Sequence, residues 1–396
     1  MKPIPAIRRT RRDISFVAKR GCQVLLALLL IIPFGLLEAA PLPIPGNEPP
    51  VDALADISGV ADFCWIDDLV EEAIRQKRLP GAVIIVGQHE RILYRKAFGH
   101  RALVPDPEPM SIDTVFDLAS LTKVVATTTS IMQLVDTGRI FLEDSVTRYI
   151  PEFKRHGKSG ITVRHLLTHM SGLRPGINPA RRWRGYGAAI EQITDDVPRT
   201  PPGENIVYSD LNFILLGEIV RRVSGVSLDQ FAREHLFKPL GMQDTMYQPT
   251  ANIRSRIAPT ERCWKGARPC GGPDGTMLRG LVHDPSARRM GGSPGHAGLF
   301  STVDDLSIFC RMLLGDGVFG QTRILSPASI VAMMSPSTPL NKGHLRGLGW
   351  SLDTTCNDGN KKPSPLPIDH SGFTGTKLWL HPATGLYIVF LSNRLH

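Results

Sequence analysis

The stretch Phe116-Asp117-Leu118-Ala119-Ser120-Leu121-Thr122-Lys123-Val124-Val125 is the one around which the rest of the chain is organised. A helical pattern of apolar residues follows it as far as Leu134. Residues three apart share one face of a helix, so Ser120 and Lys123 are expected side by side near the helix N-terminus. A serine hydroxyl needs a neighbouring base to act as a nucleophile, and a helix N-terminus offers free backbone N–H groups to an oxyanion. The Ser-x-x-Lys pattern also occurs by chance on protein surfaces, so further motifs are needed to decide whether Ser120 is catalytic.

Two further segments contain groups that can take part in catalysis, each next to an expected helix or strand. Tyr208 lies in Pro202-Gly203-Glu204-Asn205-Ile206-Val207-Tyr208-Ser209-Asp210, just before an apolar helix expected over 211–223. A phenol beside an ammonium has a lowered pKa and can act as a general base. The segment His370-Ser371-Gly372-Phe373-Thr374-Gly375-Thr376 enters a C-terminal strand. A strand edge can pair with an extended substrate and give an N–H to an oxyanion, and Gly372 is expected to let the substrate backbone approach closely.

Composition indicates a globular protein with a basic N-terminus. The chain has 396 residues, of which 42% are hydrophobic and 21% charged, and its formal net charge is +9. Residues 1–40 hold seven basic and two acidic side chains, so more than half of the excess lies there. The basic excess is therefore mostly a targeting feature, and it does not indicate nucleic acid binding.

The N-terminus has the pattern of an export signal. A basic region precedes an apolar run from Cys22 to Leu37, which ends in Glu38-Ala39-Ala40. We predict a signal peptide over 1–40, with an uncleaved N-terminal anchor as the alternative, although the run is short for a membrane span. A Pro-rich linker is predicted over 41–60. The expected location is periplasmic or extracellular, with membrane attachment only through an uncleaved N-terminal segment.

The apolar periodicity predicts an α+β fold of the α/β sandwich type. A helix is expected over 65–78, and a hairpin follows with strands over 82–86 and 92–98. Strands return only near the C-terminus, over 349–352, 377–381 and 386–392. We therefore predict one catalytic domain over 61–396, with an antiparallel sheet built from about 61–119 and 340–396. Helices flank the sheet, and a large, mainly helical part is inserted at about 120–339.

Cysteine and histidine spacing gives no sign of a metal centre. Five cysteines follow Cys22, and Cys263 and Cys270 flank a Gly/Pro-rich loop that a disulfide could close. His165 and His169 are four apart, but the Glu that a zinc metalloprotease needs is missing. We expect no metal and no cofactor.

The three motifs, in this order, resemble the serine β-lactamase and penicillin-binding protein superfamily in its class C-like branch. The resemblance extends over about 61–394. Further segments resemble the family's loop after its second helical part, its helix-ending turn and its glycine-rich segment before a helix, at 166–173, 237–242 and 295–302. It implies a β-lactamase/transpeptidase-like fold and an acyl-enzyme mechanism.

The resemblance also implies residue roles. Ser120 would be the nucleophile, Lys123 would share its proton and keep the local field positive, and Tyr208 would exchange protons with Ser120 and the leaving group. The backbone N–H groups of Ser120 and Phe373 would form the oxyanion hole. The substrate would be bound by His370, Ser371, Gly372 and Asp210.

Two motifs depart from the family pattern. The family's Tyr-x-Asn is Tyr208-Ser209-Asp210 here, so that an amide becomes a carboxylate. Its Lys-Thr-Gly is His370-Ser371-Gly372, which replaces an ammonium by a group mostly neutral at pH 7. A neutral imidazole can still donate one hydrogen bond to a substrate carbonyl. Both changes favour esters or amides over β-lactams.

These features predict an exported serine hydrolase that acts on esters or amides, peptidoglycan-derived D-alanyl peptides among them. The alternatives are a β-lactamase and a non-catalytic binding or sensing module on the same fold. The partner is expected to be a small molecule or a cell-wall peptide. The Arg-rich stretch over 174–184 is read either as a loop that recognises an anionic substrate or as a solvated loop; nucleic acid binding has no fold signal to support it.

Overall fold

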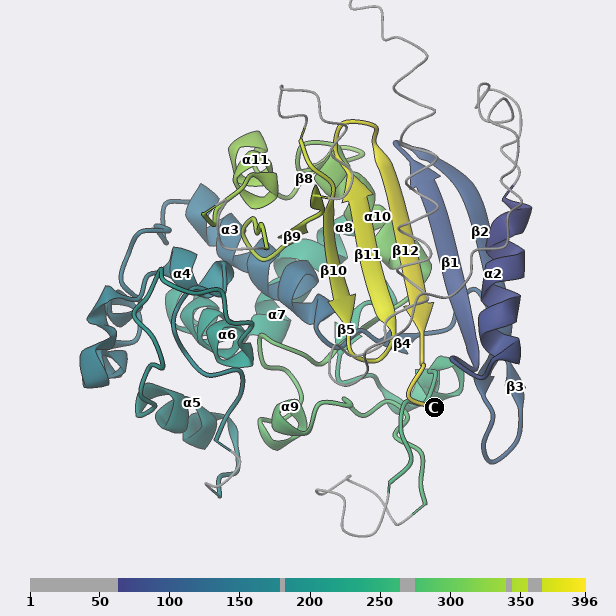
Figure 1. The fold of residues 1–396 in the computed structure, drawn as a ribbon, viewed down its shortest axis with the longest axis horizontal. Coiled ribbons are helices and arrows are strands. Elements are labelled where there is room, and N and C mark those ends of the chain that lie inside the picture. The colour runs from purple at the N-terminus through teal and green to yellow at the C-terminus, as the bar shows by residue number, and fades with distance from the viewer. Residues whose placement is uncertain (1–62, 179–181, 264–274, 340–343, 355–364) are drawn as a thin grey trace, which may run out of the picture. The chain divides into compact units, whose positions relative to one another are not determined.

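The computed structural model describes residues 63–396 except 179–181, 264–274, 340–343 and 355–364 (Figure 1). The predicted signal peptide and linker lie outside these residues. The chain divides into two compact units, Met1–Gln76 and Lys77–His396. In the first unit, α2 (Cys64–Arg75) matches the helix expected over 65–78. Among the described residues, no helix has the length and apolar character needed to cross a membrane.

The second unit contains a seven-stranded sheet that takes strands from both ends of the chain. Its strands are β1 (Gly81–Gln88), β2 (Arg91–Ala102), β3 (Glu108–Pro109), β9 (Ser351–Leu352), β10 (Ile368–Gly372), β11 (Thr376–His381) and β12 (Leu386–Ser392). The order is β3-β2-β1-β12-β11-β10-β9, and every pair is antiparallel. β1 pairs with β12 from Ala82↔Ser392 to Gln88↔Leu386, so the first and last strands join the two halves. The predicted antiparallel sheet is confirmed.

Helices are the main secondary structure between these strands, as the periodicity predicts, and long irregular loops connect them. They are η2 (Lys123–Thr128), α3 (Thr129–Asp136), η3 (Val146–Arg148), η4 (Pro151–Gly160), α4 (Val163–Leu167), α5 (Tyr186–Thr194), α6 (Asp210–Ser224), α7 (Leu228–Ala232), η5 (Arg233–Phe237), α8 (Lys238–Leu240), η6 (Ala251–Arg256), α9 (Pro285–Arg289), α10 (Val303–Leu314) and α11 (Pro327–Met334). α10 packs against β1 and β12, where Ser307 Oγ lies 2.7 Å from the hydroxyl of Tyr387. α6 is followed by Gly225, whose φ of +85° suits a residue without a side chain.

The expectation that strands return only near the C-terminus is wrong. β4 (Phe116–Asp117), β6 (Leu299–Ser301) and β5 (Met246–Tyr247) form a second, three-stranded sheet in the order β4-β6-β5, and β7 (Val318–Phe319) pairs with β8 (Thr322–Arg323). Strands of two or three residues show no period in the sequence, and the partners in the three-stranded sheet are far apart along the chain. The small sheet matters because β4 leads directly into the nucleophile segment, where Leu118 N–H donates to Leu299 O at 2.9 Å.

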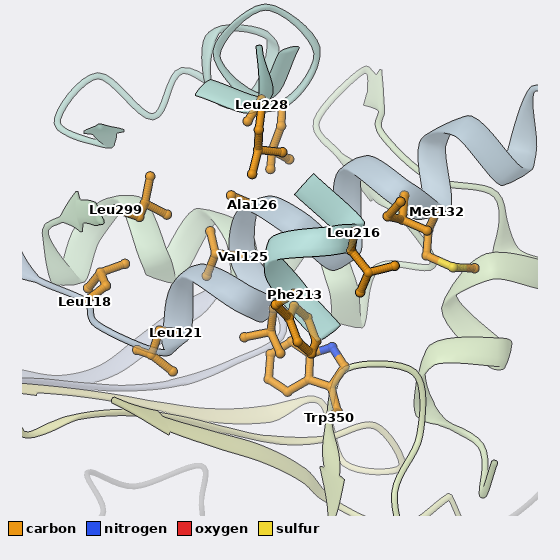
Figure 2. Close-up of a cluster of buried hydrophobic side chains, with 14 of the residues drawn as sticks. Leu118, Leu121, Val125, Ala126, Met132, Phe213, Leu216, Leu228, Leu299 and Trp350 are labelled. Carbon is orange, nitrogen blue, oxygen red and sulfur yellow. The ribbon is translucent and has the colours of Figure 1, made fainter. Parts of the chain in front are cut away.

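The helix that follows Ser120 runs through the hydrophobic core (Figure 2). Leu121 and Val125 are fully buried, in the same cluster as Phe213 of α6 and Trp350. Burying a side chain of this size contributes about 1.5–3 kcal/mol. The helix opens as a π-helical segment over Lys123–Thr128, a form often found at functional sites. A well-packed helix therefore holds Lys123 in place.

Candidate active site

Ser120 lies at the junction between β4 and the buried helix. It is half-buried, and its carbonyl accepts a backbone hydrogen bond from Lys123 N–H at 3.0 Å. The residue before it, Ala119, has φ +46°, a left-handed conformation that side chains disfavour. The Nζ atom of Lys123 lies 3.0 Å from Ser120 Oγ. The structure therefore brings the two residues together as the Ser-x-x-Lys spacing predicts.

The ammonium of Lys123 is fully buried and has three hydrogen-bond acceptors. Besides Ser120 Oγ, Nζ lies 2.9 Å from the backbone oxygen of His296 and 2.8 Å from Asp210 Oδ1. Burial alone lowers the pKa of Lys123, but the charge of Asp210 and the neighbouring Tyr208 outweigh it, so the pKa is raised above its ordinary value. Lys123 is thus a fixed cation beside the nucleophile and not a neutral base.

Tyr208 faces this cation from the segment before α6. Its side chain is 41% exposed, and Lys123 Nζ lies 5.0 Å from the centroid of its ring. The backbone on both sides is anchored to His169, because Val207 N–H donates to His169 O at 2.9 Å and Ser209 N–H donates to His169 Nδ1 at 3.0 Å. Tyr208 is therefore an accessible phenol on an anchored backbone.

His169 supports Tyr208, a role that the sequence did not reveal. Its ring packs on the Tyr208 ring at 4.4 Å between centroids, and its Nδ1 also lies 3.3 Å from Asn212 Nδ2. Burial and nearby cations hold the pKa of His169 well below its ordinary value, so the ring is neutral. His165 does not join it, since His165 Nδ1 accepts Thr162 N–H at 3.2 Å and caps α4. The four-residue spacing of the two histidines thus serves capping and support.

His370 on β10 is buried and neutral. Burial, with the charges of Arg346 and Lys123, holds its pKa well below the ordinary value. Its Nδ1 lies 3.0 Å from Ser371 O, so the neutral ring donates its one hydrogen there. The expectation that this hydrogen orients a substrate carbonyl is therefore wrong: Nε2 is left as an acceptor. The ring centroid lies 6.2 Å from that of Tyr208.

The residues after His370 form the turn towards β11. Ser371 is exposed, and Phe373 is 58% exposed, with its ring stacked on His283 at 5.7 Å. Gly372 is buried, and a Cβ there would come 2.3 Å from Leu118 O. We expected Gly372 to let a substrate backbone approach closely. In the structure, the backbone that approaches it is that of the nucleophile segment, so that expectation is incomplete.

Acidic groups also lie close to Lys123. Single ligand atoms of Asp210, Asp284 and His296 lie within 4.8 Å of one another, and His296 Nε2 is 3.1 Å from Asp284 Oδ1. Burial would raise the pKa of Asp284, but the charge and hydrogen bond of His296 lower it overall. This group does not suit a divalent ion, because the Lys123 ammonium already lies 2.8 Å from Asp210 and would repel it.

Two other predicted features fall partly outside the described residues. Cys263 is disulfide-bonded, and Cys270, its expected partner, lies outside them. In the Arg-rich stretch, Arg174 Nε forms an ion pair with Asp196 Oδ2 at 2.9 Å, and Trp183 packs against the guanidinium of Arg289. Arg174 is thus engaged within the protein, which favours a structural role for this residue.

Known proteins resemble the chain over nearly all of its described length. A family model described as Beta-lactamase matches residues 66–396. A protein of Escherichia coli (strain K12) named "Putative D-alanyl-D-alanine carboxypeptidase" is 30% identical over 360 residues, covering 84% of this chain and 81% of the relative. An N-acetylmuramyl-L-alanine amidase of Bacillus subtilis (strain 168) is also 30% identical, covering 84% and 80%.

A solved structure shares the fold. The penicillin-binding protein homolog from Caulobacter crescentus superposes with a TM-score of 0.68 at 22% identity, covering 84% of this chain and 91% of that one. The site geometry, the family match and the relatives agree with the resemblance noted from the motifs. The chain therefore belongs to the beta-lactamase family, within the serine β-lactamase and penicillin-binding protein superfamily, and is a serine hydrolase of that fold.

Proposed function

We propose that this protein forms an acyl-enzyme on Ser120 with ester or amide substrates, D-alanyl peptides among them. The observation that carries the proposal is the buried Lys123 ammonium, which lies 3.0 Å from Ser120 Oγ and 5.0 Å from the centroid of the Tyr208 ring. A structural lysine needs no nucleophile beside it. A fixed cation next to a hydroxyl and an accessible phenol is what acyl transfer requires.

The steps follow from this arrangement. Ser120 Oγ attacks the carbonyl carbon, and its proton passes to the Tyr208 oxygen, which acts as the general base beside the Lys123 ammonium. The carbonyl oxygen becomes an oxyanion, held by the backbone N–H groups of Ser120 and Phe373. Tyr208 then returns the proton to the leaving alcohol or amine as the bond to it breaks. Water attacks the acyl-enzyme by the same route, releases the acid and restores Ser120.

Charge around the site supports a preference for neutral substrates. His370 offers an acceptor and no positive charge, and Asp210 adds a carboxylate whose side chain is 34% exposed. An ammonium at the position of His370, as in the family pattern, would attract a substrate carboxylate, and His370 supplies no such charge. We therefore infer that small neutral esters and amides are hydrolysed with higher kcat/KM than penicillins.

The relatives support the cell-wall branch of this substrate class. The names of the two curated relatives both denote amides of alanine, a D-alanyl-D-alanine bond in one and an N-acetylmuramyl-L-alanine bond in the other. An amide of alanine without a free carboxylate next to the cleaved bond suits the charges described above better than a free D-alanyl-D-alanine terminus does.

A matched substrate panel tests the proposal. We would measure kcat/KM for a p-nitrophenyl ester, a D-alanyl peptide with an amidated C-terminus, the same peptide with a free carboxylate, and a chromogenic cephalosporin. We expect the ester and the amidated peptide to be preferred, and Ser120→Ala to abolish all turnover. Preference for the cephalosporin would refute the substrate class, and turnover of none of them would favour the binding module.

Export belongs to the same proposal. It is supported by the basic and apolar pattern of residues 1–40, which ends in Glu38-Ala39-Ala40. The intact mass of the protein purified from the cell envelope or the medium tests it. We expect a mature chain that begins near residue 41, and a full-length chain in the cytoplasm would refute it.

A further inference from the structure

A buried carboxylate lies next to the nucleophile, and none of the steps above uses it. Asp117 ends β4 and is 2% exposed. Its Oδ1 accepts Ala119 N–H at 2.9 Å, and its Oδ2 accepts His283 N–H at 2.6 Å. Within the described residues, Asp117 forms no ion pair with a basic side chain. Its two oxygens therefore bind backbone N–H groups from two separate segments.

The first of these segments is the nucleophile turn. Ala119 directly precedes Ser120 and has φ +46°. A left-handed residue that is not glycine costs about 1–3 kcal/mol and persists only where its surroundings hold it. The hydrogen bond from Ala119 N–H to the Asp117 side chain closes a two-residue turn of the kind that aspartate favours. Asp117 thereby fixes the peptide that leads into Ser120.

The second segment reaches Phe373 through a side chain. The His283 ring stacks on the Phe373 ring with an interplanar angle of 26°. Phe373 is 58% exposed, so burial does not hold it. Its other support is Arg394, whose Nε donates to Phe373 O at 3.0 Å. Because Asp117 holds the backbone of His283, it fixes the ring against which Phe373 rests.

A third connection runs through the backbone of Asp117 itself. Thr374 Oγ1 donates to Asp117 O at 2.7 Å, and Thr376 Oγ1 donates to Leu118 O at 3.0 Å. These two hydroxyls tie the turn between β10 and β11 to the end of β4. The turn that carries the Phe373 N–H is therefore attached to the residue that also holds Ala119.

We propose that Asp117 is a positioning residue that sets the distance between the two oxyanion-hole donors, the backbone N–H groups of Ser120 and Phe373. It holds the first through Ala119 and the second through His283 and Thr374. The inference rests on the proposed function, since it takes these two groups as the donors. Preorganised donors dominate acyl-transfer catalysis, and a misplacement of about 1 Å costs about 100-fold in rate.

Asp117→Asn tests the proposal at nearly constant shape, because one oxygen becomes an NH₂ group that cannot accept a hydrogen bond. We expect kcat for the p-nitrophenyl ester to fall roughly 30- to 100-fold with KM changed less than about threefold. The affinity for a boronic acid, which places a hydroxyl in the oxyanion hole, should fall by a similar factor. Thr374→Val removes only the third connection and should lower kcat by a smaller factor, about 3- to 10-fold.

Asp305→Asn is the matched control. Asp305 is also a buried carboxylate, and its Oδ2 accepts Asp244 N–H and the hydroxyl of Thr245, both at 2.8 Å. We expect Asp305→Asn to lower the melting temperature as Asp117→Asn does while leaving kcat within about twofold. An equal loss of kcat in both variants would mean general softening and would overturn the proposal.

Hydrogen exchange separates this proposal from the proposed function. Amides of residues 371–376 should exchange faster in Asp117→Asn, or in Thr374→Val if the former does not fold, and should be unchanged in Asp305→Asn. If the wild type hydrolyses no substrate, the proposed function fails and the exchange result alone decides whether Asp117 holds this turn. Unchanged exchange in the variants would overturn the positioning role whatever the activity.

Discussion

Replacing Asp210 by asparagine tests whether its carboxylate keeps Lys123 charged. Asparagine retains the oxygen that lies 2.8 Å from Lys123 Nζ and removes the negative charge. Two unit charges at this distance attract by about 6 kcal/mol at an effective dielectric constant of about 20 and by about 1.5 kcal/mol at about 80. Lys123 is fully buried and the Asp210 side chain is 34% exposed, so an intermediate value of about 3 kcal/mol is appropriate. That corresponds to a fall of about two units in the pKa of Lys123.

The assay is the pH dependence of Ser120 acylation by a p-nitrophenyl ester between pH 6 and 11.5. We expect the wild-type rate to stay level at high pH, because the pKa of Lys123 is raised. In Asp210→Asn the rate should fall with an apparent pKa about two units lower than in the wild type, as Lys123 loses its positive charge beside Ser120 and Tyr208. Asp284→Asn is the control. That carboxylate contacts His296 instead, and it should move the profile by less than half as much.

Two results would refute this reasoning. Coincident profiles for wild type and Asp210→Asn would show that Asp210 does not hold the charge of Lys123. A rate that rises as Lys123 deprotonates would show that the lysine acts as a neutral base, contrary to the role assigned to it here.

Three other predictions concern specificity, pH and packing. His370→Lys should raise kcat/KM for a chromogenic cephalosporin relative to that for a p-nitrophenyl ester, and an unchanged ratio would remove His370 as the discriminator. The pKa values of His169 and His370 lie below the value of about 6.5 expected in the unfolded chain, so below pH 6.5 the unfolded state binds more protons than the folded state. The free energy of unfolding should therefore fall on acidification, by up to about 1.4 kcal/mol per pH unit for each ring. Urea unfolding at pH 7 and pH 5 measures this, and His370→Gln should reduce the difference. Gly372→Ala should lower both activity and melting temperature, because the added Cβ would meet Leu118 O. Gly187→Ala in α5, where nothing lies within 4 Å of the added Cβ, should instead stabilise the fold by about 0.5–1 kcal/mol. Thermal melts and ester kinetics on both variants would show whether the backbone contact at Gly372 matters.

Local pattern was enough to predict the elements with strong periodicity. The continuous apolar runs of β1, β12 and α6 are visible in the sequence, and their approximate bounds and the antiparallel sheet are confirmed. The Ser-x-x-Lys spacing predicts the contact between Ser120 and Lys123, since it depends only on helix geometry. These features can be predicted without knowing which distant segments of the chain contact one another.

The features that the sequence did not reveal arise from contacts between distant segments. β4 and β6 have two and three residues, too short to show a period, and they pair across more than 180 positions. The support of Tyr208 by His169 depends on a hydrogen bond to Ser209, and the acidic partner of His296 depends on the loop before α9. The hydrogen of His370 is used by its own neighbour, Ser371, a detail that residue type alone does not give.

The central claim is that Ser120 carries the acyl group, and intact-mass spectrometry of acid-quenched reactions tests it most directly. We predict that wild-type protein mixed with a p-nitrophenyl ester gains the mass of one acyl group, that peptide mapping places it on Ser120, and that Ser120→Ala gains none and loses about 10⁴- to 10⁶-fold in kcat at unchanged melting temperature. An acyl group on another residue, or more than a tenth of wild-type activity in Ser120→Ala, would contradict the account.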